Sequence, residues 1–455
     1  MQTFNVINHI TEMAAQDEIE RMTRIAAASK AYYGKYTPPL KTAFGKADDN
    51  ALPNFARVIV DKGAAFLFGK EVDLDIRRPD GETQTDQDDD RWLDSCLKFN
   101  RFQSLMLNAA TNGGISGHAF LKLNGARNGE KYPRIIILDS NSVFVTTDPE
   151  DITQVIRYRI QFNAIDPKDG KPIVRRQMIE RDKNGAWTIC DYVSKSGGGF
   201  TPMNSPIVWP FAWPPILDCQ NLPAPNAYYG MSDLEPDILH LIERAHYVIS
   251  NTGRINRFHA HPKTVGKGFK AGEVAAAPDD MIVLPSDTSD IKILEAHGDI
   301  TGSLELYDKL YDALFMIARI PPVSVGKLET IGAVAGIALQ ILYAPIMEMT
   351  NAKRMLYAPM LEALGERLLE MGGYRGRSVD ATWADPMPRN EVEQRQIASE
   401  DLGMGIVDKE TIATKLGYDW SKIQARMSAT STDAAAKLMT AMENRPPAPN
   451  DGTNL

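Results

Sequence analysis

The sequence predicts an α+β protein in which long helices and short strands occupy separate stretches of the chain. Residues 230–370 contain three long helical patterns, interrupted by one short β-rich excursion. Residues 118–219 contain short β-branched segments separated by turn residues. The helical stretch carries no catalytic signature, so these long helices indicate a structural part of a machine rather than an enzyme.

Size and charge narrow the class of protein. At 455 residues the chain can form two to four domains with a sizeable core, and 43% hydrophobic with 24% charged residues is an ordinary globular composition. The formal charge of −9 disfavours a general nucleic-acid binder, because surfaces that grip DNA tightly are strongly basic. It does not exclude a protein past which DNA slides.

The cellular location follows from the cysteines and from the absence of export signals. Three cysteines without a C-x-x-C pair (Cys96, Cys190, Cys219) indicate reduced thiols rather than disulfides or zinc ligands. The first residues lack a secretory pattern. The most apolar run, 334–347, is interrupted by Gln340 and Pro345 and is shorter than the roughly 20 residues that cross a bilayer. We therefore expect folding in a reducing cytoplasm.

The first region, to residue 117, is predicted to be mainly helical. Residues 55–69 have apolar residues at helical spacing and end on Gly69, as a helix C-cap does. Residues 91–112 are a second predicted helix, closed by Gly113 and Gly114.

The second region, 118–219, is predicted to form strands, and the Lys183-Asn184-Gly185 sequence favours a hairpin turn. A proline-rich tract then leads the chain onwards. The predicted strands are 119–123, 135–138, 154–160, 177–181 and 187–192.

The third region begins with a predicted capping box, with Ser232 at the N-cap and Glu235 at the third helical position. If this helix continues to Arg257 it is about 39 Å long, which suits a strut between two bodies. Strand-like segments follow at 281–284 and 291–294, and then a second helix from Leu304 to Ile317.

A loop after Pro321 and Pro322 leads to a third helix at 333–371, which Pro345 and Pro359 are expected to kink. The remaining chain predicts a strand at 379–383, helices at 390–402 and 408–416, and a disordered polar tail.

Catalytic and metal motifs were weighed and set aside. No Gly-Lys pair has the upstream glycine of a phosphate-binding loop, so ATP hydrolysis is not expected. Asp86, Asp88 and Asp90 resemble the start of a calcium loop, but Arg91 and Leu97 occupy the positions that need Gly and Glu. We expect no metal and no cofactor.

Two basic positions have a functional interpretation only in an assembly. Lys263, Lys267 and Lys270 follow the end of the first long helix, and Lys327 lies in the loop after the two prolines. In one chain these are ordinary solvated lysines. Repeated around a ring they would hold DNA by a weak, salt-sensitive and sequence-blind attraction.

Three strings together, in their order, resemble portal proteins of tailed bacteriophages. NFARVIVDKGAAFLFGK at 54–70 resembles an early helix of that family. IPP at 320–322, continuing to GAVAGIAL at 332–339, is similar to its tunnel loop and the start of its long kinked helix. GIVDKET at 405–411 resembles its C-terminal helical segment, so the resemblance covers about 54–427.

The resemblance implies a portal fold: an α/β wing, long stem helices, a small clip, a kinked tunnel helix and a helical crown. The implied ranges are 1–230 for the wing, 231–257 and 303–320 for the stem, 258–302 for the clip, 323–334 for the tunnel loop, 335–388 for the kinked helix with its return to the wing, 389–430 for the crown and 431–455 for the tail.

The resemblance also implies the partners and the site residues. It implies a homo-oligomeric ring of about twelve subunits at a capsid vertex of the virion, assembled in the cytoplasm of a bacterial host. Its partners would be the terminase large subunit, head-completion or adaptor proteins, major capsid and scaffolding proteins, and double-stranded DNA, with no membrane. The tunnel-loop residues expected at the channel are Ser324, Lys327, Glu329 and Thr330, and the clip lysines are Lys263, Lys267 and Lys270.

Two other classes remain as alternatives. A metal-dependent nucleic-acid-processing enzyme could use Asp385 and Glu391, or the acidic cluster at 86–90, although no spacing supports it. A membrane-associated scaffold could use the 334–347 run. Nuclease or NTPase activity, or lipid binding, would distinguish these classes from a portal.

Overall fold

The computed structural model describes residues 6–42, 48–77, 88–127, 129–167, 169–195, 199–260, 263–267, 290–294, 300–321, 324, 336–387, 391–416, 418, 420, 422–424 and 426. The chain divides into two compact units, Met1–Pro386 and Met387–Leu455. Each unit is described by itself.

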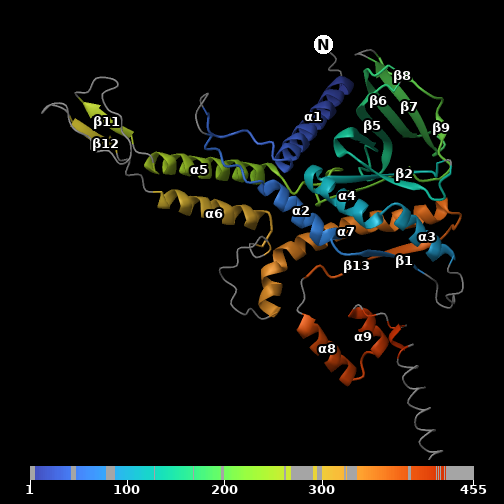
Figure 1. Cartoon of the computed structure of the whole chain (residues 1–455). Coiled ribbons are helices and arrows are strands. Elements are labelled where there is room, and N and C mark those ends of the chain that lie inside the picture. Colours follow the sequence, from blue (N-terminus) through green and yellow to red (C-terminus); the bar gives the residue numbers. More distant parts are fainter. Residues whose placement is uncertain are drawn as a thin grey trace, which may run out of the picture. The chain divides into compact units, whose positions relative to one another are not determined.

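The main core of the first unit lies between helices and a small antiparallel sheet. The helices are α2 (Phe55–Phe68), α3 (Asp88–Phe99), α4 (Phe102–Ser116) and the second half of α7 (Gly336–Met371). The sheet has the order β10–β2–β3, from β2 (His118–Asn124), β3 (Arg134–Leu138) and β10 (Ile216–Gln220). Side chains from all of these elements meet in one apolar cluster. Figure 1 shows α2, α3, α4 and α7 close to one another.

A two-stranded ribbon packs against the same core. It pairs β1 (Val72–Arg77) with β13 (Ser378–Trp383), so segments about 300 residues apart in the chain lie side by side. Val72 and Val379 are the buried members of the ribbon. Outward-facing Arg77 pairs with Asp380 across the two strands.

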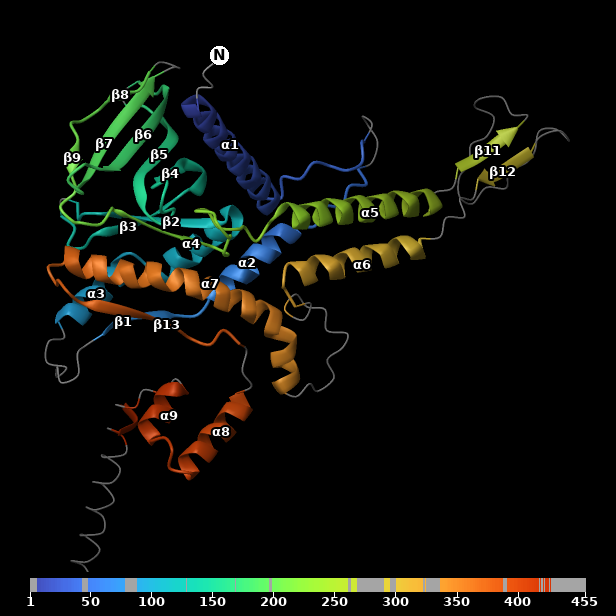
Figure 2. The same ribbon diagram turned by 180° about the vertical axis from the view of Figure 1, so that it is seen from behind.

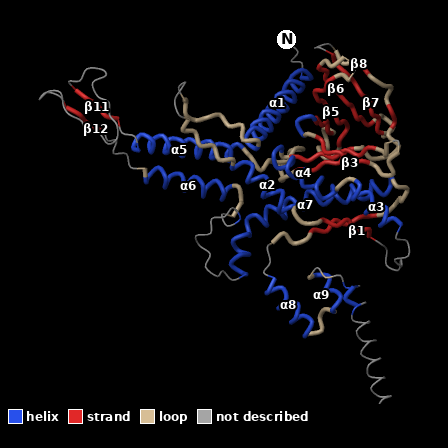
Figure 3. Tube along the Cα trace, viewed as in Figure 1, coloured by secondary structure: helices blue, strands red, loops and turns tan. Residues whose placement is uncertain are grey.

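A second antiparallel sheet has its own core. Its order is β4–β5–β6–β7–β8, with β9 also paired to β7. Tyr158, Ile160, Ile179 and Trp187 are buried on one face. Figure 3 shows these strands as a group separate from the helices. The strands are β4 (Val143–Thr147), β5 (Val155–Ile165), β6 (Pro172–Arg181), β7 (Trp187–Lys195), β8 (Thr201–Pro202) and β9 (Ile207–Val208), and a 3₁₀ turn η1 (Ser140–Ser142) precedes them.

Four long helices dominate the rest of the first unit. They are α1 (Val6–Tyr32), α5 (Pro236–Ala260), α6 (Thr301–Ile317) and α7. Pro345 and Pro359 both lie inside α7, and Figure 2 shows its axis bending near the N-terminal end. A proline inside a helix removes a backbone donor, which is the reason the sequence predicts a kinked helix here. The hairpin β11 (Lys263–Lys267) with β12 (Asp290–Leu294) lies between α5 and α6 in the chain.

The second unit contains α8 (Glu391–Gly403) and α9 (Lys409–Lys415). Gly405 between them has a φ of 70°, a left-handed conformation that favours glycine. Both helices agree with the sequence prediction within a residue or two.

Two predictions about helix ends are wrong. Residues 91–112 do not form one helix, because Arg101 has a φ of 51° and separates α3 from α4. Gly113 and Gly114 do not end α4 either. They are buried inside it, and the helix ends at Gly117, whose φ is 83°.

The predicted capping box at Ser232 forms one of its two hydrogen bonds and does not start the helix, since the Ser232 hydroxyl accepts from the Leu234 amide rather than from that of Glu235. The Ser232 amide donates to the Glu235 carboxylate at 2.8 Å, but the Asp233 amide and the Ser232 hydroxyl both donate to the Gly114 carbonyl at 2.8 Å. These bonds hold residues 232–234 against α4, so α5 begins at Pro236, a residue suited to a first helical position.

The predicted strands at 119–123, 135–138, 154–160, 177–181, 187–192, 291–294 and 379–383 are confirmed, with shifted ends. The Asp182–Gly185 turn between β6 and β7 is also confirmed, with Gly185 at a φ of 87°. Strands β1, β4, β10 and β11 were not predicted. The predicted strand at 281–284 lies outside the described residues.

None of the helices in the described part of the chain has the length and apolar character that crossing a bilayer requires.

Candidate functional site: the stem, its hairpin and the kinked helix

The two long helices α5 and α6 lie side by side, and both views show them together (Figures 1 and 2). On α5 the buried side chains follow helical spacing at Ile238, Ile242, Ala245 and Val248. This apolar stripe explains why the chain forms a long helix here. The remaining faces of α5 carry mostly polar and charged residues.

Aromatic rings fix the base of α6 against α2. Phe315 is buried, and its ring lies 4.6 Å from that of Tyr311 and 6.1 Å from that of Phe55. Beyond Ile317 the chain turns at Arg319, whose φ is 58°, and the Ile320 amide donates back to the Phe315 carbonyl at 2.9 Å. The helix therefore ends in a defined turn before Pro321.

An N-terminal arm, residues 48–54, is bound along α5. The Asp49 carboxylate lies 2.7 Å from Arg257 and 3.6 Å from Arg254, two arginines near the C-terminal end of the helix. The Ala51 amide donates to the Ser250 hydroxyl at 2.9 Å. His246 contacts the Pro53 carbonyl at 2.8 Å, and burial lowers the pKa of its imidazole. The arm thus offsets positive charge on α5.

Helices α6 and α7 leave large apolar side chains exposed. Met316 is 77% exposed, Ile341 69% and Met355 75%. Exposed apolar side chains mark an interaction surface in soluble proteins where they form a contiguous patch. The other exposed apolar residues of these helices are Leu304, Leu306, Ile317 and Leu342.

The sequence-predicted channel residues are only partly placed. Ser324 forms a tight turn, in which its amide and its hydroxyl donate to the Pro321 carbonyl at 2.9 and 2.7 Å. Lys327, Glu329 and Thr330 lie outside the described residues. The grouping of these four residues at a channel therefore stays a prediction.

Two of the three lysines expected in the clip, Lys263 and Lys267, lie on the hairpin that follows α5 in the chain. Lys263 pairs in register with Leu294, and Lys267 with Asp290. The Lys267 side chain is exposed. Lys270 lies outside the described residues.

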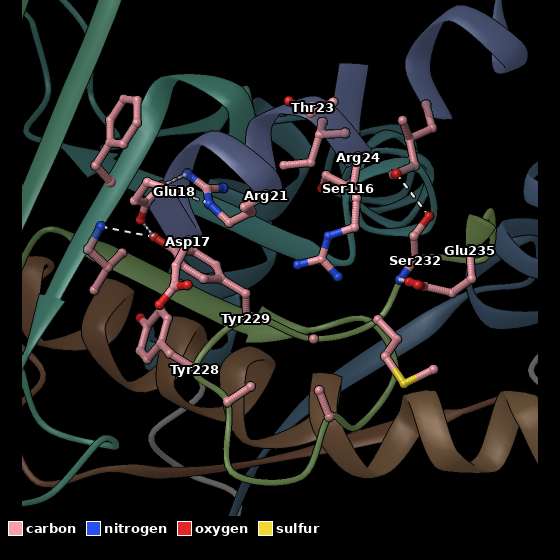
Figure 4. A pocket seen from close by; sticks show the side chains of 18 of the residues that line it. Asp17, Glu18, Arg21, Thr23, Arg24, Ser116, Tyr228, Tyr229, Ser232 and Glu235 are labelled. Carbon is pink, nitrogen blue, oxygen red and sulfur yellow. Dashed lines mark hydrogen bonds and ion pairs between the residues drawn. The ribbon is translucent and has the colours of Figure 1, made fainter. Parts of the chain in front are cut away.

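A hollow of about 910 Å³ lies between α1, strands β4 and β5, and residues 224–243. Figure 4 shows Arg24 extending into it and Arg21 turned towards Glu18. Arg21 is buried. It bonds Glu18 at 3.0 Å and the Val143 carbonyl at 3.0 Å, and its guanidinium lies 4.2 Å from the centre of the Tyr229 ring. Arg21 therefore attaches α1 to the β region.

A buried histidine–carboxylate pair lies between the two sheets. His118 Nε2 is 2.8 Å from Asp218, which also accepts hydrogen bonds from Tyr158 at 2.9 Å and from Tyr228. Burial alone would raise the pKa of Asp218, but these hydrogen bonds outweigh burial and lower it. Burial and the Asp218 charge raise the pKa of Tyr158 well above its usual value.

This pair has no nucleophile. Within the described residues the Nδ1 atom of His118 has no hydrogen-bond partner, so no serine or cysteine completes a triad. No three His, Cys, Asp or Glu side chains of the described segments gather as a metal site. The arrangement can hold elements together, and it offers no assembled reaction centre in the part of the chain that the structure describes.

Comparison with known families identifies the family to which this chain belongs. The family model described as "Phage portal protein, SPP1 Gp6-like" matches residues 14–178 and 226–419, which is well over half of the chain. The chain belongs to this family of phage portal proteins. Portal proteins are structural, so α5, α6, α7 and the hairpin are parts of a head-to-tail connector.

Solved structures similar to this portal protein come from gene transfer agent (GTA) particles. A chain of the native virion matches with TM-score 0.47 and 13% identity, covering 86% of this chain and 99% of that one. A chain from the neck of an empty particle, computed with C6 symmetry, matches with TM-score 0.46 and 14% identity, covering 83% and 96%. A chain from the native neck with C12 symmetry has TM-score 0.41 and 15% identity, covering 80% and 88%. No curated protein matches the chain.

Sequence reasoning missed the residues that hold the portal helices in place. Hydrogen bonds and ion pairs join segments more than 100 residues apart in the chain, and they are made by Asp49, by Arg21 and by the pair of Lys353 and Asp233. The Gly113-Gly114 dipeptide was the available indication, because adjacent glycines inside an apolar helix also mark a close approach of other groups.

Proposed function

We propose that this portal protein assembles into a closed ring, of about twelve subunits, around a channel for viral DNA. The observation that carries this proposal is the apolar exposure of α6 and α7 in a member of the portal family. In a ring, one subunit's exposed face is covered by a different face of its neighbour, and such heterologous contacts close only as a ring. Met316, Ile341 and Met355 are the proposed contact residues.

Each segment then has a proposed role. Residues 1–230 form the wing, 231–257 and 303–320 the stem, and 258–302 the clip. Residues 323–334 form the tunnel loop, and 335–388 form the kinked helix with its return to the wing. Residues 389–430 form the crown, and 431–455 form a tail. The stem pair α5 and α6, with its hairpin, supports this assignment because it separates a small β element from the main core.

DNA passes through the channel without sequence recognition. An acidic subunit, repeated around a ring, repels phosphate and keeps the wall from holding the duplex. Lysines at 263, 267, 270 and 327 supply the weak, salt-sensitive attraction that modulates passage, with Ser324, Glu329 and Thr330 beside the last of them. The chain acts at the capsid vertex of the virion after assembly in the host cytoplasm.

Docking partners bind the outside of the ring. The terminase large subunit docks on the clip during packaging, and head-completion or adaptor proteins replace it afterwards. Major capsid and scaffolding proteins contact the wing. Binding of purified terminase to the full ring, and its loss when residues 263–294 are replaced by a short Gly-Ser turn, tests the first of these contacts.

Ring formation is tested by electron microscopy and native mass spectrometry of the purified chain. Rings with a central hole are expected, and Met316→Glu is expected to shift the population towards monomers. Ile165→Glu is the matched control, since Ile165 is 71% exposed at the end of β5, far along the chain from the stem. Equal loss of rings in both variants, or in neither, would contradict the proposed contact.

The channel role of the tunnel loop is tested by Lys327→Ala. The variant is expected to form normal rings and to change DNA packaging or retention, because only the contact with phosphate is removed. Lys183→Ala, which removes an exposed lysine in the β6–β7 turn, serves as the control. Unchanged packaging and retention with Lys327→Ala would remove this lysine from the channel.

A further inference from the structure

A buried ion pair lies in the middle of the kinked helix α7. Lys353 Nζ is 2.7 Å from Asp233 Oδ2, and both side chains are 2% exposed. Lys353 is the only buried lysine among the described residues. Asp233 lies just before α5, so the pair joins the kinked helix to the entry of the stem.

The surrounding backbone is shaped to admit this pair. A Cβ atom at Gly63 of α2 would lie 3.1 Å from Asp233 Oδ2 and 3.2 Å from Lys353 Nζ. A Cβ at Gly114 of α4 would lie 2.8 Å from the same carboxylate oxygen. Side chains at these two positions would therefore displace the ion pair, which explains glycines inside two buried helices.

Further hydrogen bonds fix the carboxylate from its other side. Asn221 Nδ2 donates to Asp233 Oδ1 at 2.9 Å, and the Asp233 amide donates to the Gly114 carbonyl at 2.8 Å. Asp233 is thus held by α4 and by the segment before α5, independently of α7. From α7, the group that contacts this carboxylate is the Lys353 ammonium.

Stability does not explain a charge at this place. Lys353 interrupts a fully buried stripe of α7 that otherwise consists of uncharged side chains. Desolvation of two buried charges offsets most of their attraction, and a well-packed apolar pair is commonly as stable. The stripe comprises Thr350, Tyr357, Leu361, Leu364 and Leu368.

The need to fix the axial position of α7 does explain the buried charge at Lys353. Leu361, Leu364 and Leu368 of α7 recur every three to four residues and are buried, so a displacement of this part of the helix by one turn would again place leucine against the core. A single buried polar position removes this degeneracy, because a displaced helix would leave a buried charge without a partner. We propose that the Lys353–Asp233 pair is a register lock, which fixes α7 along its axis against α4 and the start of α5.

The lock is tested with a neutral pair of similar volume. Lys353→Met with Asp233→Asn removes both charges and keeps the hydrogen bond from Asn221. Spin labels at Asn108→Cys on α4 and Glu366→Cys on α7 report the axial position, since both residues are exposed and the native cysteines are buried. The distance between the labels is measured by pulsed electron paramagnetic resonance on the full-length chain.

We expect one distance in the parent chain. In the neutral pair we expect a second population, displaced by about 5 Å, the rise of one helical turn. The control is Arg57→Gln with Asp61→Asn, which removes an exposed ion pair and should leave one distance. A single unchanged distance in the neutral pair would overturn the inference. Loss of cooperative folding in that variant would also overturn it, because the pair would then act through stability.

Discussion

Two adjacent residues of α6, Phe315 and Met316, should separate folding of the subunit from assembly of the ring. Phe315 is 2% exposed and packs against Phe55 and Tyr311, whereas Met316 is 77% exposed. Truncating a buried phenylalanine to alanine costs about 3–5 kcal/mol from lost transfer energy and the cavity left behind. The same truncation at a surface methionine changes the free energy of unfolding by less than about 0.5 kcal/mol.

For assembly of the ring we expect the opposite order, with the larger effect from the Met316 substitution and the smaller from the Phe315 substitution. If the neighbour covers Met316, alanine removes part of a burial energy of about 1.5–3 kcal/mol at each contact. A loss of about 1.4 kcal/mol weakens association tenfold. Met316→Ala should therefore raise the protein concentration at which half of the chains form rings by about tenfold. Correctly folded Phe315→Ala should still assemble.

The assay pairs urea denaturation, at concentrations below ring formation, with mass photometry across a concentration series. Far-UV circular dichroism follows unfolding, and hydrogen exchange of residues 301–317 reports whether α6 detaches locally. Equal unfolding free energies for the two variants would refute the packing of Phe315. An unchanged assembly midpoint for Met316→Ala would refute its place in the contact between subunits.

Three further outcomes are expected. Asp49→Asn should loosen the N-terminal arm by about 1 kcal/mol, because its partner Arg257 is partly solvated, and hydrogen exchange of residues 48–54 should rise. His118→Phe should raise the pH of the acid-unfolding midpoint measured by circular dichroism. The hydrogen bonds that hold the pKa of Asp218 low stabilise the fold above the unfolded carboxylate pKa of about 3.9, and this stability is lost as the pH falls through the folded value. Gly114→Ala should cost about 1–3 kcal/mol in urea denaturation, because its Cβ would meet a carboxylate oxygen at 2.8 Å, whereas Gly125→Ala meets nothing within 4 Å and should be neutral.

The sequence predicted most elements because their patterns are local. Helix α2 follows from apolar residues on one face between Asn54, whose side chain accepts a hydrogen bond from the Arg57 amide, and Gly69. The bend of α7 follows from a proline, and the β6–β7 hairpin follows from Asn184 and Gly185. In each case the physical cause lies within a few residues of its effect.

The failed predictions depended on distant residues. Gly113-Gly114 has the local pattern of a helix stop, but Asp233 and Tyr357, more than 100 residues away, pack against these glycines inside α4. Strand β1 alternates well, yet its partner β13 lies about 300 residues further along the chain. Asp49 likewise has no local pattern that connects it to Arg257.

Exposed apolar side chains of α6 and α7 and charged side chains of α5 have different physical requirements. Surface such as that of Met316 and Ile341 gains free energy when a neighbouring subunit removes it from water. Charged groups lose hydration when they are buried without a partner, so they are stable where water or DNA phosphate can reach them. The arm contributes to this division, since Asp49 offsets the charge of two arginines near the end of α5. We therefore expect the apolar faces of α6 and α7 to contact neighbouring subunits and the charged faces of α5 to remain in water, and Met316→Ala and Asp49→Asn test these two expectations.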